Sequence, residues 1–306
     1  MSQKMRLVLV LSLAFIVSLS APYATAQKET TGTWTSSISN KGARINLNFD
    51  RSTSSGRKNQ TGQTYDFSEL QNLTREQVDR GGPVKFSLVR EAGTIECEGN
   101  FENGKGSGTF RFTPNQAFIS GMKSRGFDFE NDPPTTQPGR LEDRVFTAAV
   151  LNVTTAIADD LSSAGFGKLT VGDLFKATIF KVDSAFMREM KASGFPNMGM
   201  EELVKARIFK IDAKFVSEAT QMGFDKEPFE SLVKMKIFKV TTEFIAEVRN
   251  EGLNNLSVEE LVRLKIFKID GEFIRKAKAE GVPLTVERMV QKRLGVERDH
   301  RRTLLD

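Results

Sequence analysis

Few residues in this chain have the types and spacing that catalysis or metal binding requires. His300 is the only histidine and lies in a highly charged stretch near the C-terminus, and Cys97 is the only cysteine. Catalysis by a histidine-activated nucleophile and zinc binding each need several such residues close together. Cys97 alternates with Ile95 and Phe101, which favours a small buried residue on one face of a strand, with an intermolecular disulfide as the alternative. We therefore expect no metal, no cofactor and no nucleophilic site.

Two acidic motifs could bind calcium or take part in hydrolysis. Asp128, Glu130 and Asp132 alternate as calcium ligands often do, but the glycine and the distal glutamate of an EF-hand are missing. We expect an acidic loop there, with calcium binding as the alternative. Asp159 and Asp160 occupy adjacent helix positions, which do not face each other. Paired carboxylates from distant parts of the chain, as in a hydrolase of envelope polymers, stay open as a second function because such pairing is spatial.

A glycine-rich segment resembles the start of a phosphate-binding loop. Gly99, Gly104 and Lys105 have the required spacing, but Gly106 stands where serine or threonine would bind magnesium. Asn103-Gly104, between two segments of alternating polarity, instead predicts a tight β-hairpin turn. We expect the hairpin and no bound nucleotide.

The candidate binding residues belong to four recurrences of Ile-Phe-Lys. They place an aromatic ring beside a positive charge every 29 residues, in the pairs Phe180 and Lys181, Phe209 and Lys210, Phe238 and Lys239, and Phe267 and Lys268. Stacked units would align these pairs as a ridge, which could bind a protein or an anionic component of the cell envelope through several weak contacts. The alternative is that the rings pack between units and the lysines are only solvated.

These turns lie inside a tandem repeat. Four near-copies align without gaps: LFKATIFKVDSAFMREMKASG, LVKARIFKIDAKFVSEATQMG, LVKMKIFKVTTEFIAEVRNEG and LVRLKIFKIDGEFIRKAKAEG. A divergent copy precedes them, and the closing glycines of all five are Gly165, Gly194, Gly223, Gly252 and Gly281. A half-copy at residues 118–126 and a partial copy at 285–295 flank the array. Such a period predicts stacked helix–turn–helix units, that is, an α-solenoid.

Each unit is predicted to contain two capped helices. Ser257 and Glu260 form a capping box at the start of one first helix. Its core-facing stripe is expected to hold Val258, Leu261, Val262 and Ile266. On its solvent side we expect i,i+4 pairs such as Glu201 with Lys205 and Glu230 with Lys234. Second helices are expected to follow the N-cap residues Asn115, Thr154, Asp183, Asp212, Thr241 and Asp270, to end at the left-handed glycine, and to bury Phe186, Phe215, Phe244 and Phe273.

The N-terminal part changes to a period of two, which is typical of strands. We expect strands at residues 33–38, 44–49, 84–90, 94–101 and 106–112, and a long polar loop over 50–83 with a short helix near 74–78. The fold class is therefore α+β, a small antiparallel β domain followed by an α-solenoid. The expected divisions are 1–26, 27–114, 115–295 and a charged tail at 296–306.

Residues 1–26 have the pattern of a secretory signal peptide. Lys4 and Arg6 precede an apolar run of thirteen residues (7–19), and Ala24-Thr25-Ala26 fits a cleavage site. The run is short for a transmembrane span, so we expect no membrane-spanning segment after cleavage. We expect a bacterial periplasmic or secreted protein, and this location together with the small net charge argues against nucleic acid as a partner.

The repeat resembles one in bacterial secreted proteins of unknown function. Similar units follow the peptidase domain in some membrane metallopeptidases of the penicillin-sensing antirepressor type. The resemblance covers residues 115–295, in the pattern L-x-x-h-K-I-x-x-h-[DT]-x-x-F-h with the closing glycine, where h is apolar. In that family the position of Lys181 is often glycine and that of Phe180 often histidine, and Asn152 suits a left-handed conformation better than lysine does. The peptidase motif is absent, so the resemblance implies a periplasmic repeat module for sensing or assembly and no activity.

These observations favour an exported, non-catalytic binding or scaffold protein. It would act through protein–protein or cell-envelope contacts of the helical repeats. The hydrolase is the alternative from another class, and a purely structural spacer is a third possibility.

Overall fold

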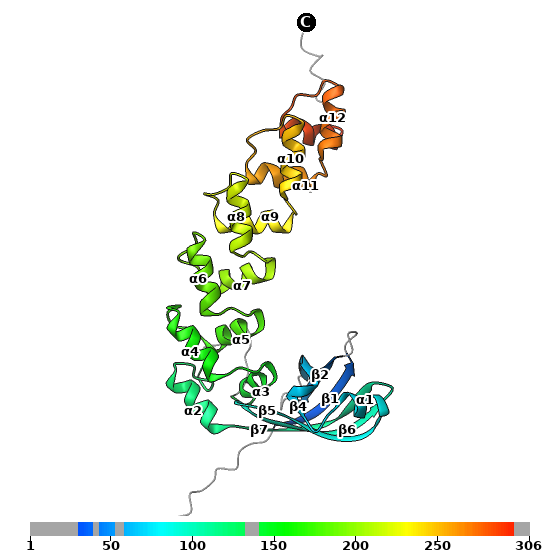
Figure 1. Ribbon diagram of the computed structural model, residues 1–306, viewed down its shortest axis with the longest axis vertical. Helices are drawn as coiled ribbons and strands as arrows, with labels where there is room; N and C mark the ends of the chain where they lie inside the picture. The colour runs from blue at the N-terminus through cyan, green and yellow to red at the C-terminus, as the bar shows by residue number, and fades with distance from the viewer. Residues whose placement is uncertain (1–29, 39–42, 53–57, 132–140, 297–306) are drawn as a thin grey trace, which may run out of the picture.

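The protein consists of a curved antiparallel sheet followed by a column of short helices (Figure 1). The computed structural model describes residues 30–38, 43–52, 58–131 and 141–296. Within these residues the sheet has seven strands in the order β3-β2-β1-β7-β6-β5-β4. The strands are β1 (Thr30–Ile38), β2 (Arg44–Ser52), β3 (Lys58–Asp66), β4 (Leu70–Gln71), β5 (Gly82–Arg90), β6 (Gly93–Glu102) and β7 (Lys105–Pro114). The α+β class is thus confirmed.

The five predicted strands are present, but the polar loop expected over residues 50–83 is wrong. Strand β3 lies there and pairs along its whole length with β2, from Arg44 opposite Asp66 to Ser52 opposite Lys58. Its sequence, KNQTGQTYD, contains Tyr65 as its only large apolar residue, so it has no apolar alternation to identify it. The short helix expected near 74–78 is α1 (Arg75–Arg80), capped by Thr74.

Glycines allow the sheet to bend around a large side chain. Gly99 of β6 and Gly108 of β7 lie directly opposite one another. A Cβ atom on Gly99 would lie 2.7 Å from the indole ring of Trp34, which is fully buried. The Trp34 indole N–H donates to the Glu98 carbonyl at 3.2 Å. A side chain at Gly99 would therefore displace the tryptophan that fills this part of the core.

Helix α3 (Leu141–Leu151) covers the buried face of the sheet. The Phe146 ring contacts those of Phe49, Phe110 and Phe112, with centroids 5.7, 5.2 and 5.3 Å apart. Aromatic pairs at such distances add stability beyond the area they bury. The sheet and the first helices therefore share one hydrophobic core.

Two polar contacts fix α3 on the sheet. Arg51 of β2 is 4% exposed and forms an ion pair of 2.7 Å with Asp143. Burial lowers the pKa of Arg51, although the nearby Asp143 carboxylate opposes this shift. On β3, the buried Tyr65 hydroxyl donates to the Val150 carbonyl at 2.9 Å. Burial raises the Tyr65 pKa, so the phenol stays protonated and keeps this hydrogen bond.

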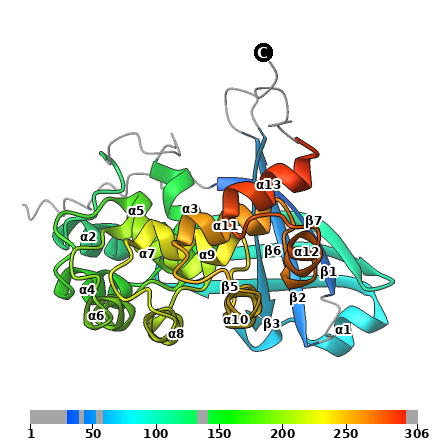
Figure 2. The same ribbon diagram turned by 90° about the horizontal axis from the view of Figure 1, so that it is seen from above.

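The remaining helices form two rows. Even-numbered helices, the even row, are α2 (Gln116–Ser124), α4 (Thr155–Ser163), α6 (Ser184–Ala192), α8 (Ala213–Gln221), α10 (Thr242–Asn250) and α12 (Gly271–Ala279). The odd row consists of α3, α5 (Val171–Phe180), α7 (Met200–Phe209), α9 (Phe229–Ile237), α11 (Val258–Ile266) and α13 (Val286–Leu294). Each odd helix packs on the next odd one, and Figure 2 shows α5–α11 on one side of α6, α8 and α10.

Ion pairs join consecutive odd helices. Lys205 binds Glu230 at 2.6 Å, Lys176 binds Glu201, and Lys234 binds Glu259. The predicted i,i+4 pairings of Glu201 with Lys205 and of Glu230 with Lys234 are therefore wrong, because each lysine reaches the first turn of the next odd helix instead. All these side chains are at least partly exposed, so each pair contributes little alone.

Carboxylates of one even helix bind the first amide of the next. Asp160 accepts hydrogen bonds from the amide and hydroxyl of Ser184, Glu189 from the amide of Ala213, and Glu247 from that of Gly271. These amides lie in the first turn, where a helix has no internal partner for them. At the base of the column Glu91, in the β5–β6 turn, does the same for Thr155 of α4. The sheet thus occupies the place of a preceding unit.

The predicted caps are present. All six predicted N-cap side chains accept a hydrogen bond from their own helix, and Ser257 and Glu260 form the capping box. The closing glycines have positive φ between 79° and 103°. Ile266, expected to face the core, is 51% exposed, and buried Leu264 and Ile269 fill the core at this end of α11. No helix among the described residues is long and apolar enough to cross a bilayer.

Candidate functional site

The Ile-Phe-Lys segments form the C-terminal ends of α5, α7, α9 and α11. In each, the apolar residue after the lysine donates its amide to a carbonyl five residues earlier, for example Val182 to Ala177 at 3.0 Å and Ile211 to Ala206 at 2.8 Å. The same bond closes the even helices, where glycine occupies the position before the donor, as in Phe195 to Met190 at 3.1 Å. Lysine thus stands in the odd helices where glycine stands in the even ones.

The lysines adopt the left-handed conformation that this turn requires. Their φ values are 58° at Lys181, 55° at Lys210, 53° at Lys239 and 52° at Lys268. The other non-glycine residues with positive φ in the described chain are all asparagines: Asn72, Asn103, Asn152 and Asn255. Asparagine and glycine tolerate this region, whereas other residues adopt it at a cost of about 1–2 kcal/mol.

The phenylalanines and the lysines of the Ile-Phe-Lys segments differ in their exposure to solvent. Phe180, Phe209, Phe238 and Phe267 are partly buried and pack against the core, as the alternative interpretation of the ridge expected. The four lysines are exposed. The isoleucines before the rings are exposed as well, Ile179, Ile208 and Ile266 by 51% and Ile237 by 48%. We name the eight exposed residues the Ile–Lys edge: Ile179, Lys181, Ile208, Lys210, Ile237, Lys239, Ile266 and Lys268.

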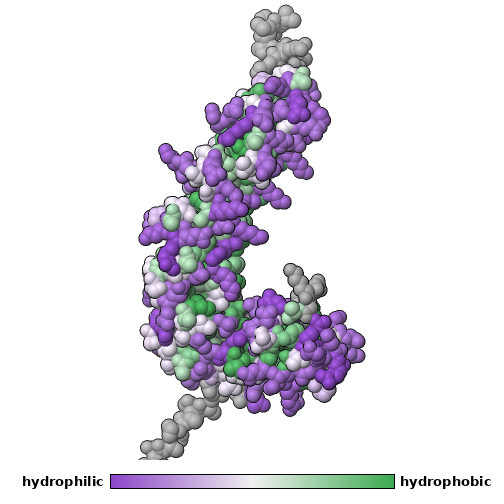
Figure 3. All heavy atoms as spheres, in the orientation of Figure 1, coloured by the Kyte–Doolittle hydropathy of each residue, from purple (hydrophilic) through white to green (hydrophobic). Residues whose placement is uncertain are grey.

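Exposed apolar side chains are concentrated on this edge. Of the seven large hydrophobic residues that are exposed in the described chain, four are its isoleucines, and Leu294 and Val296 follow in α13 and directly after it. Leu294 lies nine residues after its N-cap Thr285, and Ile266 lies nine after Ser257. The seventh, Val89, is on the sheet. Figure 3 accordingly shows a column that is mostly hydrophilic, with hydrophobic colour in separate patches.

A cation from the next odd helix covers one phenylalanine in each of α6, α8, α10 and α12, and of these four rings only Phe273 is partly buried rather than buried. Arg207, Lys236, Lys265 and Arg293 lie over the rings of Phe186, Phe215, Phe244 and Phe273, at 3.6, 3.7, 4.3 and 4.0 Å from the centroids. Cation–π contact is favourable at these distances. These four cations are therefore engaged in packing between units, in contrast to the lysines of the Ile–Lys edge.

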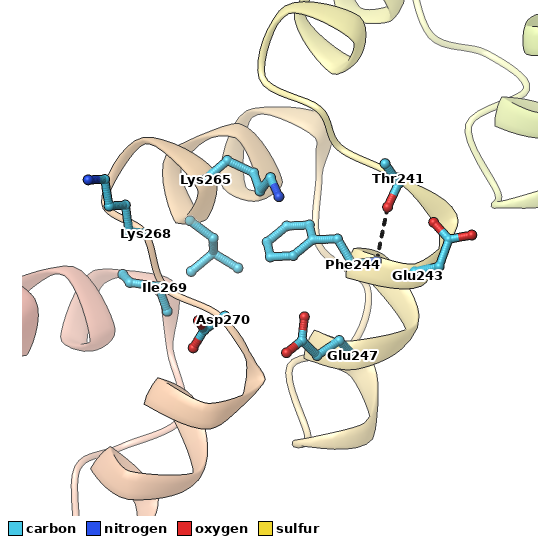
Figure 4. A pocket seen from close by; sticks show the side chains of 9 residues that line it. Thr241, Glu243, Phe244, Glu247, Lys265, Lys268, Ile269 and Asp270 are labelled. Carbon is cyan, nitrogen blue, oxygen red and sulfur yellow. Dashed lines mark hydrogen bonds between the residues drawn. The ribbon is translucent and has the colours of Figure 1, made fainter.

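A shallow groove of about 670 Å³ lies beside one of these turns, between α10, α11 and the start of α12. In Figure 4 Lys265 points toward the Phe244 ring, while the amino group of Lys268 points away from it. Two of the three acids that line the groove bind backbone amides of α12: Glu247 accepts from Gly271 at 3.0 Å, and Asp270 from Phe273 at 2.9 Å. The groove thus offers aromatic and cationic surface, and these two carboxylates are occupied.

The acidic residues considered for hydrolysis are not directed at a common point. Asp159 binds Arg125 at 2.7 Å, and this hydrogen bond lowers its pKa. The adjacent Asp160 binds Ser184 instead. A general acid needs a raised pKa at neutral pH, whereas that of Asp159 is lowered.

The calcium candidate forms a local turn. Asp128 accepts hydrogen bonds from the amides of Glu130 and Asn131 and from the Asn131 side chain, and Lys123 lies 3.3 Å away. Its pKa is lowered to about 2, mainly by the Asn131 side chain. Asp132 lies outside the described residues, as does His300. No cluster of three potential metal ligands is present in the part of the chain that the structure describes.

The glycine-rich segment is the β6–β7 hairpin, as predicted. Asn103 and Gly104 both have positive φ, 50° and 72°, which is the geometry of a tight two-residue turn. Cys97 is buried on β6, and burial raises the pKa of its thiol. A second shallow groove, of about 710 Å³, lies over the sheet, where Lys85 and Glu98 form an exposed ion pair of 3.0 Å.

In α3, the first odd helix, the C-terminal end that is equivalent to the Ile–Lys edge is covered by the sheet. By alignment on the left-handed residue, Val150 of α3 corresponds to Ile179, and Asn152 corresponds to Lys181. Val150 is fully buried, and its carbonyl accepts the hydrogen bond from Tyr65 of the sheet. Lysine is therefore absent where this chain covers its own edge and present at the four free ends of α5, α7, α9 and α11, while the free end of α13 has Gly295 at this position.

Sequence reasoning identified the lysines but not the isoleucines. Ile266 has the spacing of a core residue, and only the burial of Leu264 and Ile269 beside it reveals that it faces solvent. The regular contrast between lysine and glycine at equivalent helix ends was the available signal.

No protein-family model, no curated protein and no solved structure matches this chain. The geometry above is therefore the basis for assigning a function.

Proposed function

We propose that this chain is an exported, non-catalytic binding or scaffold protein of the bacterial cell envelope, and that the Ile–Lys edge is its binding surface. Helices α3–α13 would act as an α-solenoid of 29-residue units. The units that end in Ile-Phe-Lys each contribute one isoleucine and one lysine to the edge. The partner would be a protein or an anionic envelope component, as expected from the charge and the apolar character of the edge.

The repeating contacts between units support the solenoid. Ion pairs recur 25 residues apart, as in Lys205 with Glu230, and carboxylate–amide contacts 24 residues apart, as in Glu189 with Ala213. Contacts that link each unit to the next are what stabilise repeat proteins, because one unit cannot bury its apolar face alone.

The observation that carries the binding function is the left-handed lysine. Glycine at this position would avoid the conformational cost, and the same chain uses glycine at the equivalent ends of its even helices. Four lysines retained against that cost indicate a role outside folding, since backbone strain is concentrated at functional sites. At the covered end of α3, asparagine (Asn152) stands in place of lysine, which supports the same conclusion.

The exposed isoleucines give the surface its second component. Each presents about half of its side chain to solvent, two positions before a lysine. A partner that covers several units at once would gain from many weak contacts, because each contact after the first is effectively intramolecular.

The test is retention of the mature chain by isolated cell envelopes. One variant has Lys181, Lys210, Lys239 and Lys268 changed to glutamate. The matched control has the same charge change at four exposed lysines outside the turns, Lys168, Lys191, Lys226 and Lys278. We expect the first variant to lose retention while it stays folded by circular dichroism, and the control to keep it. Equal retention of both variants would reject the edge as the binding surface.

A further inference from the structure

The chemistry of the Ile–Lys edge distinguishes a lipid surface from other partners. The exposed components are aliphatic side chains and primary amines, while the rings at Phe180, Phe209 and their equivalents are packed against the core. Protein interfaces are enriched in exposed aromatic residues and arginine and depleted in lysine. The edge has the opposite composition, so it is poorly suited to a protein partner.

An anionic polymer of sugars or phosphates would also leave half of the edge unused. Such a polymer could bind the lysines, but it offers no apolar environment for the isoleucines, which are about half exposed. A second copy of the edge is disfavoured because its lysines would face one another. A bilayer with anionic headgroups offers both components, phosphates at its surface and acyl chains just beneath.

We propose that the Ile–Lys edge binds the surface of an anionic phospholipid bilayer. The isoleucines enter the boundary between headgroups and acyl chains, and the lysines bind headgroup phosphates with their flexible stems along the surface. This inference rests on the proposed function, since it names the partner of the same surface.

The end of the column repeats the aliphatic component of the edge, with glycine in place of the lysine. In α13 the exposed Leu294 takes the position of Ile266, and exposed Val296 follows Gly295, which has a φ of 68°. Arg293, next to Leu294, covers the Phe273 ring and donates to the Lys268 carbonyl. Five consecutive odd helices thus end in an exposed aliphatic residue, each nine positions after its N-cap.

The neighbouring acids do not cancel the positive charge of the edge. Asp183, Asp212 and Asp270 each lie two residues after an edge lysine, and each accepts a hydrogen bond from the first turn of its own helix. A carboxylate at a helix N-terminus is neutralised in part by the helix dipole. The lysines are therefore the exposed charges that a bilayer would meet first.

Co-sedimentation of the full mature chain with lipid vesicles tests the proposal. The probes are vesicles of phosphatidylcholine alone and vesicles that also contain phosphatidylglycerol. We expect binding to the second kind only. Changing the four edge lysines to glutamine should weaken it roughly 100-fold or more, because each lysine near an anionic surface contributes about a fivefold factor. Changing the four isoleucines to glutamine should weaken it roughly tenfold, by loss of apolar insertion at unchanged charge.

The control changes Lys168, Lys191, Lys226 and Lys278 to glutamine, which alters net charge equally. If the control loses as much binding as the edge variant, the attraction is non-specific and the proposal is overturned. Failure of the wild type to bind anionic vesicles also overturns it. If envelope retention then still depends on the edge lysines, the proposed function stands with another partner; if retention does not depend on them, both are rejected.

Discussion

The sheet and the helix column are stabilised by contacts of different sequence range. The longest-range polar contacts of the sheet, within it and to α3, join residues 64, 85 and 92 positions apart: Trp34 with Glu98, Tyr65 with Val150, and Arg51 with Asp143. In the column they recur at 24 or 25 positions, as in Asp160 with Ser184 and Lys205 with Glu230. The sheet therefore depends on each of its contacts, whereas the column distributes its stability over equivalent ones. Because of this redundancy, the column can tolerate a residue that is unfavourable for folding, such as the left-handed lysine, at several exposed helix ends.

The largest effect is expected where the two regions share a core. Phe146→Ala removes a ring packed against Phe49, Phe110 and Phe112, and should lower the free energy of unfolding by about 3–5 kcal/mol. Hydrogen exchange should then accelerate in both the sheet and α3–α5. Phe244→Ala, within the column, should accelerate exchange only in neighbouring helices. If the sheet of the Phe146→Ala variant exchanged as slowly as that of the wild type, the core would not be shared.

The next effect separates a buried ion pair from an exposed one. Asp143→Ala leaves Arg51 buried without its partner and should cost about 3 kcal/mol in urea unfolding. The double variant Arg51→Met, Asp143→Leu should lie within about 1 kcal/mol of the wild type, because neither charge is then desolvated. In the column, Glu230→Ala should cost under about 1 kcal/mol, because Glu230 is exposed. Equal losses at Asp143 and Glu230 would remove the distinction.

Alkaline pH should weaken the sheet more than the column. Burial raises the pKa of both Cys97 and Tyr65 above their ordinary values of about 8.5 and about 10. The unfolded chain therefore releases these protons first, and stability is lost as pH rises above the unfolded pKa values. By pH 10.5, ionisation of Cys97 in the unfolded chain should have lowered the free energy of unfolding by roughly 2.5 kcal/mol. Cys97→Ala should flatten the decline between pH 8.5 and 10.5, and an unchanged slope would contradict the assignment.

The smallest effect concerns the ends of the helices. Lys239→Gly should stabilise the chain by about 1 kcal/mol, because glycine adopts the left-handed conformation without the cost to lysine. The reverse change, Gly281→Lys, should destabilise by a similar amount; a Cβ there would meet nothing within 4 Å, so the cost is conformational alone. Thermal unfolding measures both. A loss of stability in Lys239→Gly would mean that the lysine serves the fold.

The sequence predicted the column better than the sheet because local chemistry defines the column. N-caps such as Asp183 and C-terminal glycines such as Gly194 act within a single helix, and both are present in the structure. Strand β3 could not be predicted, because its pairing with β2 is decided by a partner rather than by its own polar sequence.

The proposed binding surface could be predicted only in part. Lys181 and its equivalents stood out because Ile-Phe-Lys recurs every 29 residues and places a charge beside a ring each time. The exposure of Ile179 and its equivalents depends on how Ala177 and Val182 fill the core at the helix end, which spacing along a helix does not reveal. Likewise, the ion pairs joined neighbouring helices because lysine is long enough to reach the next unit, a contact that only stacking creates.

The central claim is that the edge lysines are retained for binding rather than for folding. One preparation tests it: the mature chain with Lys181, Lys210, Lys239 and Lys268 all changed to glycine, assayed for retention by isolated envelopes next to the wild type. We expect this variant to be more stable to urea, by roughly 2–4 kcal/mol in total, and to be no longer retained. A variant retained as well as the wild type would contradict it.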